Sequence, residues 1–471
     1  MNVLLISTNR ERSPQTLIPL GACYVASAAD AAGHEVDLLD LCFERDPVAA
    51  VNQVVEWLKP DAIGVSVRNL DNCDYLQPRS YLPDVEAVIT ACRAKSDCPI
   101  ILGGTAVSQA PVAIARHLGC KLAISGEGET AFPALLTALE QGNDPATIFG
   151  ASVVEGERTI TRPVRWLPSL EPLPDPQIAR WIDLERYRDA EAAYPIQSKR
   201  GCTFQCSYCV YPHLEGACWR PRKPEWVAGE VATAETLGMR MVEFVDSVFG
   251  LPEEHAIACC EAIARLGTTI PLSTMDLNPT ACTPELIAAM NAAGFSAVGI
   301  TVESGADAIL QRLGKGYTVA DLQRARENLR KLHAKKIWVF LLGSPGETVK
   351  TVRETARFIE GLGEDDLAFI THGVRVLPGT ALHTELIAQG ETAVDDPLIH
   401  PHFYHSPAIR YAEVAHIMAT CRFPRANMAS LHDGGHRMIP MVQRMITLLG
   451  LRPPYWRYLP RLNQMRRLLH I

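Results

Sequence analysis

The chain has 471 residues, of which 47% are hydrophobic and 21% charged, as expected for a globular protein of two or three domains. Its net charge of −8 argues against a protein whose whole surface binds nucleic acid. The sequence contains no run of about 18 apolar residues and no signal peptide, so we expect a cytoplasmic protein without a transmembrane segment. In that compartment the 14 cysteines stay reduced, which favours metal ligation or catalysis over disulfides.

Residues 1–144 alternate short apolar runs with helical patterns, which predicts a doubly wound parallel sheet of the Rossmann-like type. Ligands of such sheets bind beyond the carboxyl ends of the strands, where the glycine-rich segments of this region fall. The strands are expected at 3–7, 35–40, 62–67, 99–104 and 121–126. The candidate ligand-binding residues are Leu20, Gly21, Ser66, Arg68, Gly103, Gly104, Thr105, Gly126, Glu127, Gly128, Glu129 and Thr130.

Residues 145–190 are rich in proline, which predicts an extended linker. A second α/β region follows over 191–385 and contains six units of strand and helix. Its strands are expected at 194–199, 240–246, 271–277, 297–303, 336–343 and 370–376.

Three of the cysteines, Cys202, Cys206 and Cys209, form a C-x3-C-x2-C pattern. Three thiolates within eight residues can wrap one loop around a soft-metal centre. A zinc site would need a fourth ligand, and the spacing of nearby His213 suits no zinc pattern. We therefore favour a [4Fe–4S] cluster with one open iron, while zinc remains the alternative. The other cysteines are interpreted as small buried hydrophobes.

With Tyr208 as the aromatic residue of C-x3-C-x-aromatic-C, this segment resembles the signature of the radical SAM superfamily. Four later segments resemble further motifs of that family in the same order; they lie at 243–250, 294–318, 341–348 and 376–382. The resemblance implies a partial (β/α)6 barrel of the TIM type, in which the cysteines hold a [4Fe–4S] cluster. The open iron would bind S-adenosylmethionine, and an external low-potential donor of the flavodoxin or ferredoxin type would supply the electron for its cleavage to a 5′-deoxyadenosyl radical.

The resemblance also implies roles for side chains outside the cysteine pattern. Tyr208 would lie beside the adenine, Glu303 would bind the ribose hydroxyls or the amino group, and Lys315 would meet the carboxylate of S-adenosylmethionine. Further contacts with cofactor or substrate are implied for Asp246, Pro345 and Gly346.

The segments at 18–41, 101–106 and 125–130 together resemble the cobalamin-binding domain that precedes many radical SAM domains. The loop after the first strand lacks the D-x-H-x-x-G motif of cobalamin mutases, so cobalt is expected to have no histidine ligand from the protein. Arg68 could instead lie under the corrin, contact a propionamide or make a surface ion pair. A degenerate domain that binds no cobalamin is the alternative.

The two cofactors together imply methylation of an unactivated carbon in a small-molecule substrate, such as a natural product or a lipid. The alternatives are cyclisation, oxidation or transfer of another group derived from S-adenosylmethionine. A methylthiotransferase is disfavoured, because the N-terminal cysteines do not follow the layout of that family and the C-terminus does not predict a β-barrel.

Residues 386–471 are expected to form a mostly helical region that caps the barrel and selects the substrate. Its end is basic, and apolar residues alternate with the charges, so it could touch an anionic surface or pack on its own domain. The arginines concerned are Arg437, Arg444, Arg452, Arg457, Arg461, Arg466 and Arg467.

Overall fold

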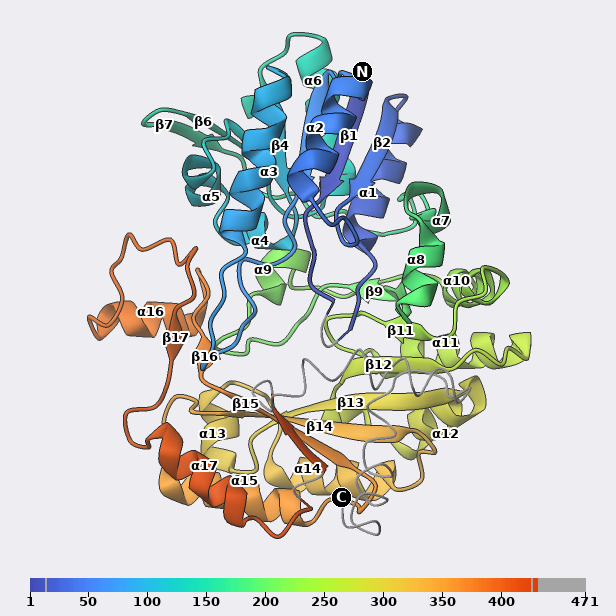
Figure 1. The fold of residues 1–471 in the computed structure, drawn as a ribbon. Helices are drawn as coiled ribbons and strands as arrows, with labels where there is room; N and C mark the ends of the chain where they lie inside the picture. Colours follow the sequence, from blue (N-terminus) through green and yellow to red (C-terminus); the bar gives the residue numbers. More distant parts are fainter. Residues whose placement is uncertain (13–14, 425–426, 431–471) are drawn as a thin grey trace.

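Two seven-stranded sheets, one in each half of the molecule, organise the fold (Figure 1). The computed structural model describes residues 1–12, 15–424 and 427–430. The first sheet belongs to an N-terminal domain and the second to a barrel-like domain that follows it. The α/β class and the order of the two architectures predicted from the sequence are confirmed.

The N-terminal sheet has the strand order β2-β1-β3-β4-β5-β6-β7, and its first five strands run parallel. Its parallel strands are β1 (Asn2–Ser7), β2 (Glu35–Asp40), β3 (Ala62–Ser66), β4 (Ile100–Gly103) and β5 (Leu122–Ile124). The helices between them are α1 (Leu20–Ala31), α2 (Pro47–Leu58), α3 (Leu82–Lys95), α4 (Thr105–Gln109), α5 (Pro111–His117) and α6 (Gly128–Glu140). Helices α1 and α6 contact each other, as do α2 and α3, so that the apolar strands are covered on both faces as predicted.

The stretch 145–190 differs from the extended linker that its prolines predicted. It begins with a 3-10 turn (Pro145–Thr147) and a hairpin of β6 (Ala151–Glu155) and β7 (Arg158–Thr161), which adds antiparallel to β5. The hairpin forms because its two strands contain no proline and are rich in β-branched residues. Pro145 begins the 3-10 turn, and the other prolines of the stretch lie at 163–176. Helices α7 (Ile178–Trp181) and α8 (Leu184–Asp189) then pack back on the N-terminal domain.

The second sheet has the strand order β18-β15-β14-β13-β12-β11-β8, with every pair parallel. Its first six strands are β8 (Tyr194–Ile196), β11 (Val242–Phe244), β12 (Leu272–Leu277), β13 (Phe295–Glu303), β14 (Lys335–Leu342) and β15 (Leu367–His372). The helices between them are α9 (Tyr211–Glu215), α10 (Pro224–Thr236), α11 (Glu253–Leu266), α12 (Pro284–Ala293), α13 (Asp307–Arg312), α14 (Val319–Leu329) and α15 (Val349–Glu360). Each strand overlaps a predicted one.

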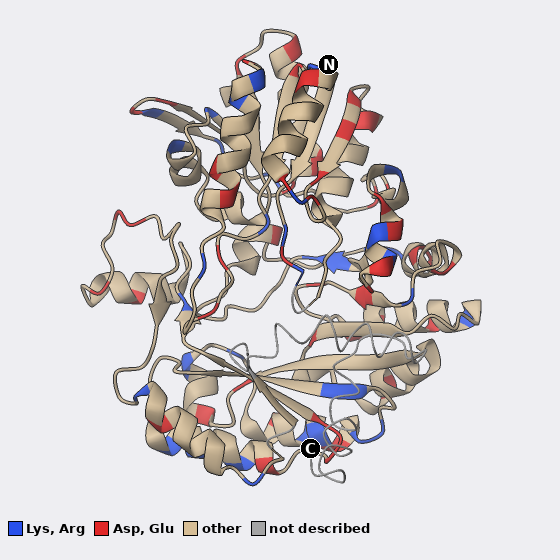
Figure 2. Cartoon of the chain, viewed as in Figure 1, with Lys and Arg blue, Asp and Glu red and all other residues tan. Residues whose placement is uncertain are grey.

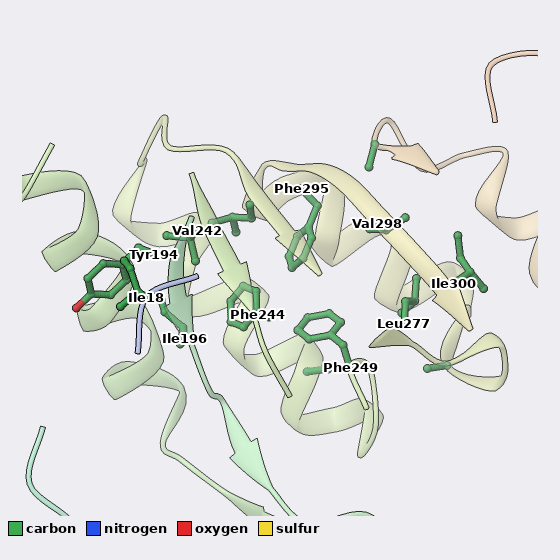
Figure 3. Close-up of a cluster of buried hydrophobic side chains, with 14 of the residues drawn as sticks. Ile18, Tyr194, Ile196, Val242, Phe244, Phe249, Leu277, Phe295, Val298 and Ile300 are labelled. Carbon is green, nitrogen blue, oxygen red and sulfur yellow. The ribbon is translucent and has the colours of Figure 1, made fainter. Parts of the chain in front are cut away.

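The core of this sheet is aromatic at its β8 end (Figure 3). Phe244, Phe249 and Phe295 pack with ring centroids 5.1–5.6 Å apart. Ile18, from the segment before α1, belongs to the same buried cluster as Tyr194 of β8. The apolar core therefore continues from one domain into the other, which fixes how they are docked.

The described part of the C-terminal region contains strands as well as the helices that were predicted. Helices α16 (Ala381–Ala388) and α17 (Tyr411–Thr420) alternate with β17 (Phe403–Tyr404), which pairs with β16 (Val374–Arg375), and with β18 (Met428–Ser430). Strand β18 adds to β15 as the seventh strand of the barrel sheet, because β15 offers a free edge. The arginines from 437 onward lie outside the described residues. None of the described helices has both the length and the apolar character needed to cross a membrane.

Candidate active site

The three predicted cysteines lie in one loop, residues 201–219, whose two ends are joined by β9 (Lys199–Arg200) and β10 (Arg220–Pro221). Cys202 is buried, while Cys206 and Cys209 are half-buried. Gly201 has φ +92°, and a Cβ there would lie 2.0 Å from the carbonyl oxygen of Cys218. The loop therefore needs glycine directly before its first cysteine.

The thiols of this loop are close enough to influence one another. Burial raises the pKa of each, that of Cys209 to about 12, whereas the positive charge of Lys315 acts in the opposite direction. Among the described residues no three His, Cys, Asp or Glu side chains are gathered as a metal-binding group, so the sulfurs are neighbours and not a closed ligand set. Three thiols on one short loop are the donors that an iron–sulfur cluster with one open iron requires.

Glu303 and Lys315, from the end of β13 and the segment after it, meet Tyr208 of this loop. The Tyr208 hydroxyl donates to Glu303 Oε1 over 2.7 Å, and Lys315 Nζ donates to the same oxygen over 3.1 Å. Lys315 Nζ also lies 3.2 Å from the Tyr208 hydroxyl. Burial lowers the pKa of Lys315, but the charge of Glu303, together with Tyr208, Tyr317 and Cys206, outweighs burial and the pKa is raised. The cluster therefore places a buried ion pair of opposite charges next to the cysteine that follows Tyr208.

Glu303 is held in an unfavourable backbone conformation at the end of β13. Its φ is +65°, and the pairing of β13 with β14 is irregular between Thr301 and Glu303. A non-glycine residue in the left-handed region costs about 1–3 kcal/mol and persists only where surrounding contacts enforce it. The bonds to Tyr208 and Lys315 are such contacts, which marks Glu303 as a functional position.

A cavity lies at the carboxyl ends of β1, β3, β4 and β5 and extends to the barrel domain. The cavity wall contributed by the N-terminal domain includes nearly all of the predicted ligand-binding residues, namely Leu20, Gly21, Ser66, Arg68, Gly103, Gly104, Thr105, Gly126, Glu127, Gly128 and Glu129. The wall contributed by the barrel domain includes Gln197, Arg200, Leu214, Glu215, Glu243 and Val245. The two halves of the molecule therefore face one shared space.

The glycines of this cavity bring backbone close to whatever occupies it. Gly104 has φ +100°, and a Cβ there would lie 2.5 Å from the carbonyl oxygen of Val67, whereas a Cβ at Gly103 would meet nothing within 4 Å. Leu5, Ile101 and Phe132 add apolar surface, and Arg68 and Ser66 add polar groups. No histidine is among the described residues that line the cavity. An apolar floor with a few polar groups is typical of a site for a large organic cofactor.

Comparisons with known proteins identify both halves. The model of the B12 binding domain matches residues 6–136, and the model of the Radical SAM superfamily matches residues 196–359. The chain combines a B12-binding domain with a radical SAM domain. The family resemblance read from the sequence motifs is confirmed.

Relatives and solved structures with the same arrangement carry methyltransferase names. An uncharacterized methyltransferase of Pyrococcus horikoshii is 25% identical over 82% of this chain and 83% of its own length. Tryptophan 2-C-methyltransferase of Streptomyces laurentii is 25% identical over 82% of this chain and 74% of its own. The structure of the radical S-adenosylmethionine methyltransferase TsrM from Kitasatospora setae, with cobalamin and a [4Fe–4S] cluster bound, matches with a TM-score of 0.86 at 21% identity over 99% of both chains. The last likeness shows a shared fold.

Three residues predicted in the radical SAM domain have other neighbours than the cluster of Tyr208, Glu303 and Lys315. Asp246 is buried and accepts bonds from Ser198 (N–H 2.6 Å, hydroxyl 2.5 Å) and from Lys199 (N–H 3.3 Å, Nζ 3.0 Å), so that its carboxylate holds the chain that leads into the cysteine loop. Pro345 and Gly346 form the turn after β14, where Gly346 has φ +79°. Their predicted contacts with cofactor remain predictions.

Three residues predicted in the B12-binding domain direct their side chains to the protein. The Thr130 hydroxyl donates to the carbonyl of Glu127 over 3.2 Å, and Thr130 does not line the cavity. It is the third residue of α6, which begins at Gly128. The carboxylates of Glu127 and Glu129 pair with arginines of the radical SAM domain. Arg68 differs from these, because no described acidic side chain lies within ion-pair distance of it and it faces the cavity.

Two acidic residues of the barrel domain were not among the predicted site residues, and of these Glu243 lines the cavity. Glu243 of β11 accepts a bond from Gln15 of the B12-binding domain over 3.2 Å. Asp276 of β12 has a pKa raised to about 7 by burial and by the negative charges of Glu243 and Glu303. Both lie at strand ends, which is where barrels keep their functional groups, and that position was the available signal.

Proposed function

We propose that the protein is a cobalamin-dependent radical SAM methyltransferase that methylates a carbon atom of a small molecule. The observation that carries the proposal is the shared space. Residues of the B12-binding domain, such as Arg68 and Gly104, and residues of the radical SAM domain, such as Leu214 and Glu243, line the same cavity. A carbon atom between two cofactors can be activated by one and methylated by the other only if both reach a common site.

The residues of the radical SAM domain have separable tasks in this proposal. Cys202, Cys206 and Cys209 would hold the [4Fe–4S] cluster. Lys315 would meet the carboxylate of S-adenosylmethionine and Glu303 its amino group or ribose, because their opposite charges are already fixed 3.1 Å apart. Tyr208 orients Glu303 through its hydroxyl. When bound, the cluster and S-adenosylmethionine supply radical chemistry and cobalamin supplies the methyl group.

In the B12-binding domain, the glycines at strand ends would let the corrin approach the backbone. Because no described histidine lines the cavity, we propose that cobalamin is bound without an imidazole ligand from the protein. Arg68 would face the corrin. Reduction would come from an external donor of the flavodoxin or ferredoxin type.

The test follows the methyl group and needs no knowledge of the natural substrate. Reconstituted full-length protein with reduced cobalamin is given S-adenosylmethionine labelled with deuterium in its methyl group, under anaerobic conditions. We expect label in the cobalamin fraction and stoichiometric S-adenosylhomocysteine. L-Tryptophan, which the name of one relative suggests, is then added as the first substrate probe, and mass spectrometry follows the label.

The nucleoside products decide between the proposal and its alternatives. S-Adenosylhomocysteine together with labelled cobalamin supports methyl transfer. Protein that binds cobalamin but releases only 5′-deoxyadenosine, with no label on cobalamin, would instead perform cyclisation or oxidation. Release of 5′-methylthioadenosine would indicate transfer of another part of S-adenosylmethionine. Either of the last two results refutes methyl transfer.

A further inference from the structure

Glu127 is the centre of a buried ion-pair network between the two domains. Its Oε1 accepts from Arg220 Nη1 over 2.7 Å and from Arg200 Nη1 over 3.2 Å, and its Oε2 accepts from the N–H of Leu167 over 3.1 Å. The three charged side chains are only 3–9% exposed. Both carboxylate oxygens of Glu127 are therefore committed to the protein and face away from solvent.

A second acidic residue completes the balance of charge. Glu129 pairs with Arg200 through Nη2, so that two buried arginines face two buried carboxylates. Burial would raise the pKa of Glu129, but the ion pair with Arg200 outweighs it and the pKa is lowered. Arg200 and Arg220 also stack on Tyr24 and Trp166, with guanidinium-to-ring distances of 5.2 and 5.6 Å. These aromatic contacts restrict the arginines to one geometry.

The two arginines stand at the two ends of the cysteine loop. They are direct partners in the antiparallel pair of β9 and β10, and the 19 residues between them, 201–219, include all three predicted cluster ligands. Figure 2 shows β9 in blue between the two domains. Arg220 Nη2 also donates to the carbonyl of Glu215 within the loop over 2.6 Å. The carboxylate of Glu127 therefore forms an ion pair with one arginine at each end of the loop.

The same residue sits in the glycine turn that walls the cavity of the B12-binding domain. Gly126 and Gly128 flank Glu127, and all three line that cavity. A Cβ on Gly126 would lie 2.4 Å from Cγ1 of Val164, and a Cβ on Gly128 would lie 2.8 Å from Cγ2 of Val25. The backbone of the turn is packed on both sides, so a shift of the turn also shifts the carboxylate of Glu127.

We propose that Glu127 is a positioning residue that couples the two cofactor regions. Its carboxylate ties both ends of the cysteine loop to the turn that lines the cavity of the B12-binding domain, so that filling the cavity and shaping the loop influence each other. The inference rests on the proposed function in that it takes the cavity as the cobalamin site and the loop as the cluster site. It assigns to Glu127 a role that differs from direct contact with cobalamin.

The molecule offers a matched control for this role. Asp71 of the B12-binding domain pairs with Arg375 of the radical SAM domain over 2.8 Å, and these side chains are 3% and 6% exposed. The pair is as buried as that of Glu127 and joins the same two domains. Arg375 otherwise donates to the carbonyls of Val376, Leu398, His400 and His402, so this junction does not hold the cysteine loop.

The experiment compares Glu127→Gln with Asp71→Asn in the full-length protein after reconstitution with iron and sulfide. The electron paramagnetic resonance spectrum of the reduced cluster is recorded before and after addition of hydroxocobalamin, and the affinity for hydroxocobalamin is titrated. For Glu127→Gln we expect changed g values, loss of the spectral response to cobalamin, and an affinity reduced by about tenfold, within the usual range of coupling between sites. For Asp71→Asn we expect the spectrum and its response to match those of the wild type.

Two results would overturn the proposal. One is a Glu127→Gln spectrum that equals the wild-type spectrum and responds equally to cobalamin. The other is an equal spectral change in Asp71→Asn, which would make the effect one of domain docking in general. If Glu127→Gln does not fold, Glu129→Gln serves as the second variant, because it removes only the second carboxylate that pairs with Arg200. Its spectrum should change in the same direction as expected for Glu127→Gln, but by less. An unchanged spectrum in Glu129→Gln also refutes the proposed coupling. Because no readout involves methyl transfer, failure of the proposed function leaves the comparison of the two variants valid.

Discussion

The cysteine-loop region and the cavity of the B12-binding domain use their residues in opposite ways. In the radical SAM domain the side chains that the sequence marked come together, and Tyr208, Glu303 and Lys315 bond to one another within 3.2 Å. In the B12-binding domain the glycines line the cavity with backbone, while the carboxylates of Glu127 and Glu129 pair with the neighbouring domain. The cysteine-loop region is therefore formed by interacting polar and charged side chains. The cavity of the B12-binding domain is formed largely by backbone that glycine leaves accessible.

This difference predicts how each region responds to substitution. Removing a side chain in the radical SAM domain should abolish an interaction with cofactor. In the B12-binding domain the harmful changes should be those that add atoms, because its glycines keep space open.

The largest effect is expected at the cysteine loop. Cys206→Ala removes one of the three thiolates proposed to hold the cluster, so reconstituted protein should lose the cluster and all turnover of S-adenosylmethionine. Iron and sulfide content and the visible spectrum provide the measurement. Cys218→Ala, an exposed cysteine in the same loop, is the control and should keep the cluster. Loss of iron from both variants would contradict the assignment of the three ligands.

Lys315→Met should weaken binding of S-adenosylmethionine by about a hundredfold, because it leaves the buried carboxylate of Glu303 without its cation. Isothermal titration of the reconstituted protein under anaerobic conditions gives the affinity, and the visible spectrum confirms that the cluster is present. Lys350→Met replaces a lysine that is 83% exposed and should bind normally. Unchanged affinity in Lys315→Met would remove Lys315 from the site.

A pair of neighbouring glycines tests the backbone-lined cavity. Gly103→Leu adds atoms where nothing lies within 4 Å, so the fold should persist while the side chain fills the cavity and lowers cobalamin affinity by about tenfold or more. Gly104→Ala meets the carbonyl of Val67 at a positive φ and should lower the stability of the B12-binding domain itself. Thermal unfolding and hydroxocobalamin titration separate the two. Normal cobalamin binding by Gly103→Leu would place the corrin elsewhere.

The sequence predicted what depends on local spacing. The strands of both sheets follow from short apolar runs, and the three cysteines and Glu303 with Lys315 stand in motifs of fixed length. It did not predict partners that the chain brings together from afar: Arg200 is separated from Glu127 by 73 positions, and Arg375 from Asp71 by 304. No periodicity within one segment records such a pairing. The hairpin of β6 and β7 was missed for a different reason, because the prolines at 163–176 suggested an extended linker for the whole stretch although residues 151–161 contain none.

The smallest expected effect concerns Glu347, which shapes the turn after β14. The side chain is fully buried; Oε2 accepts from the N–H groups of Gly343 and Ser344, and Oε1 has no partner among the described residues. Burial raises the pKa of Glu347 from 4.5 to about 7. Between these values the native state keeps a proton that the unfolded state has released, so the free energy of unfolding falls as the pH rises.

Glu347→Gln removes this titration and should flatten the pH dependence. Between about pH 6 and about pH 8 the wild type should lose about 1 kcal/mol of unfolding free energy that the variant keeps. Urea unfolding of both proteins at the two pH values measures the difference, with exposed Glu86→Gln as a control that keeps the wild-type slope. Equal slopes in wild type and Glu347→Gln would mean that the turn holds an ionised carboxylate. In that case Glu347 would contribute a negative charge beside the turn of Pro345 and Gly346. This turn would then resemble the charged cluster at Lys315 and differ from the glycine-lined cavity of the B12-binding domain.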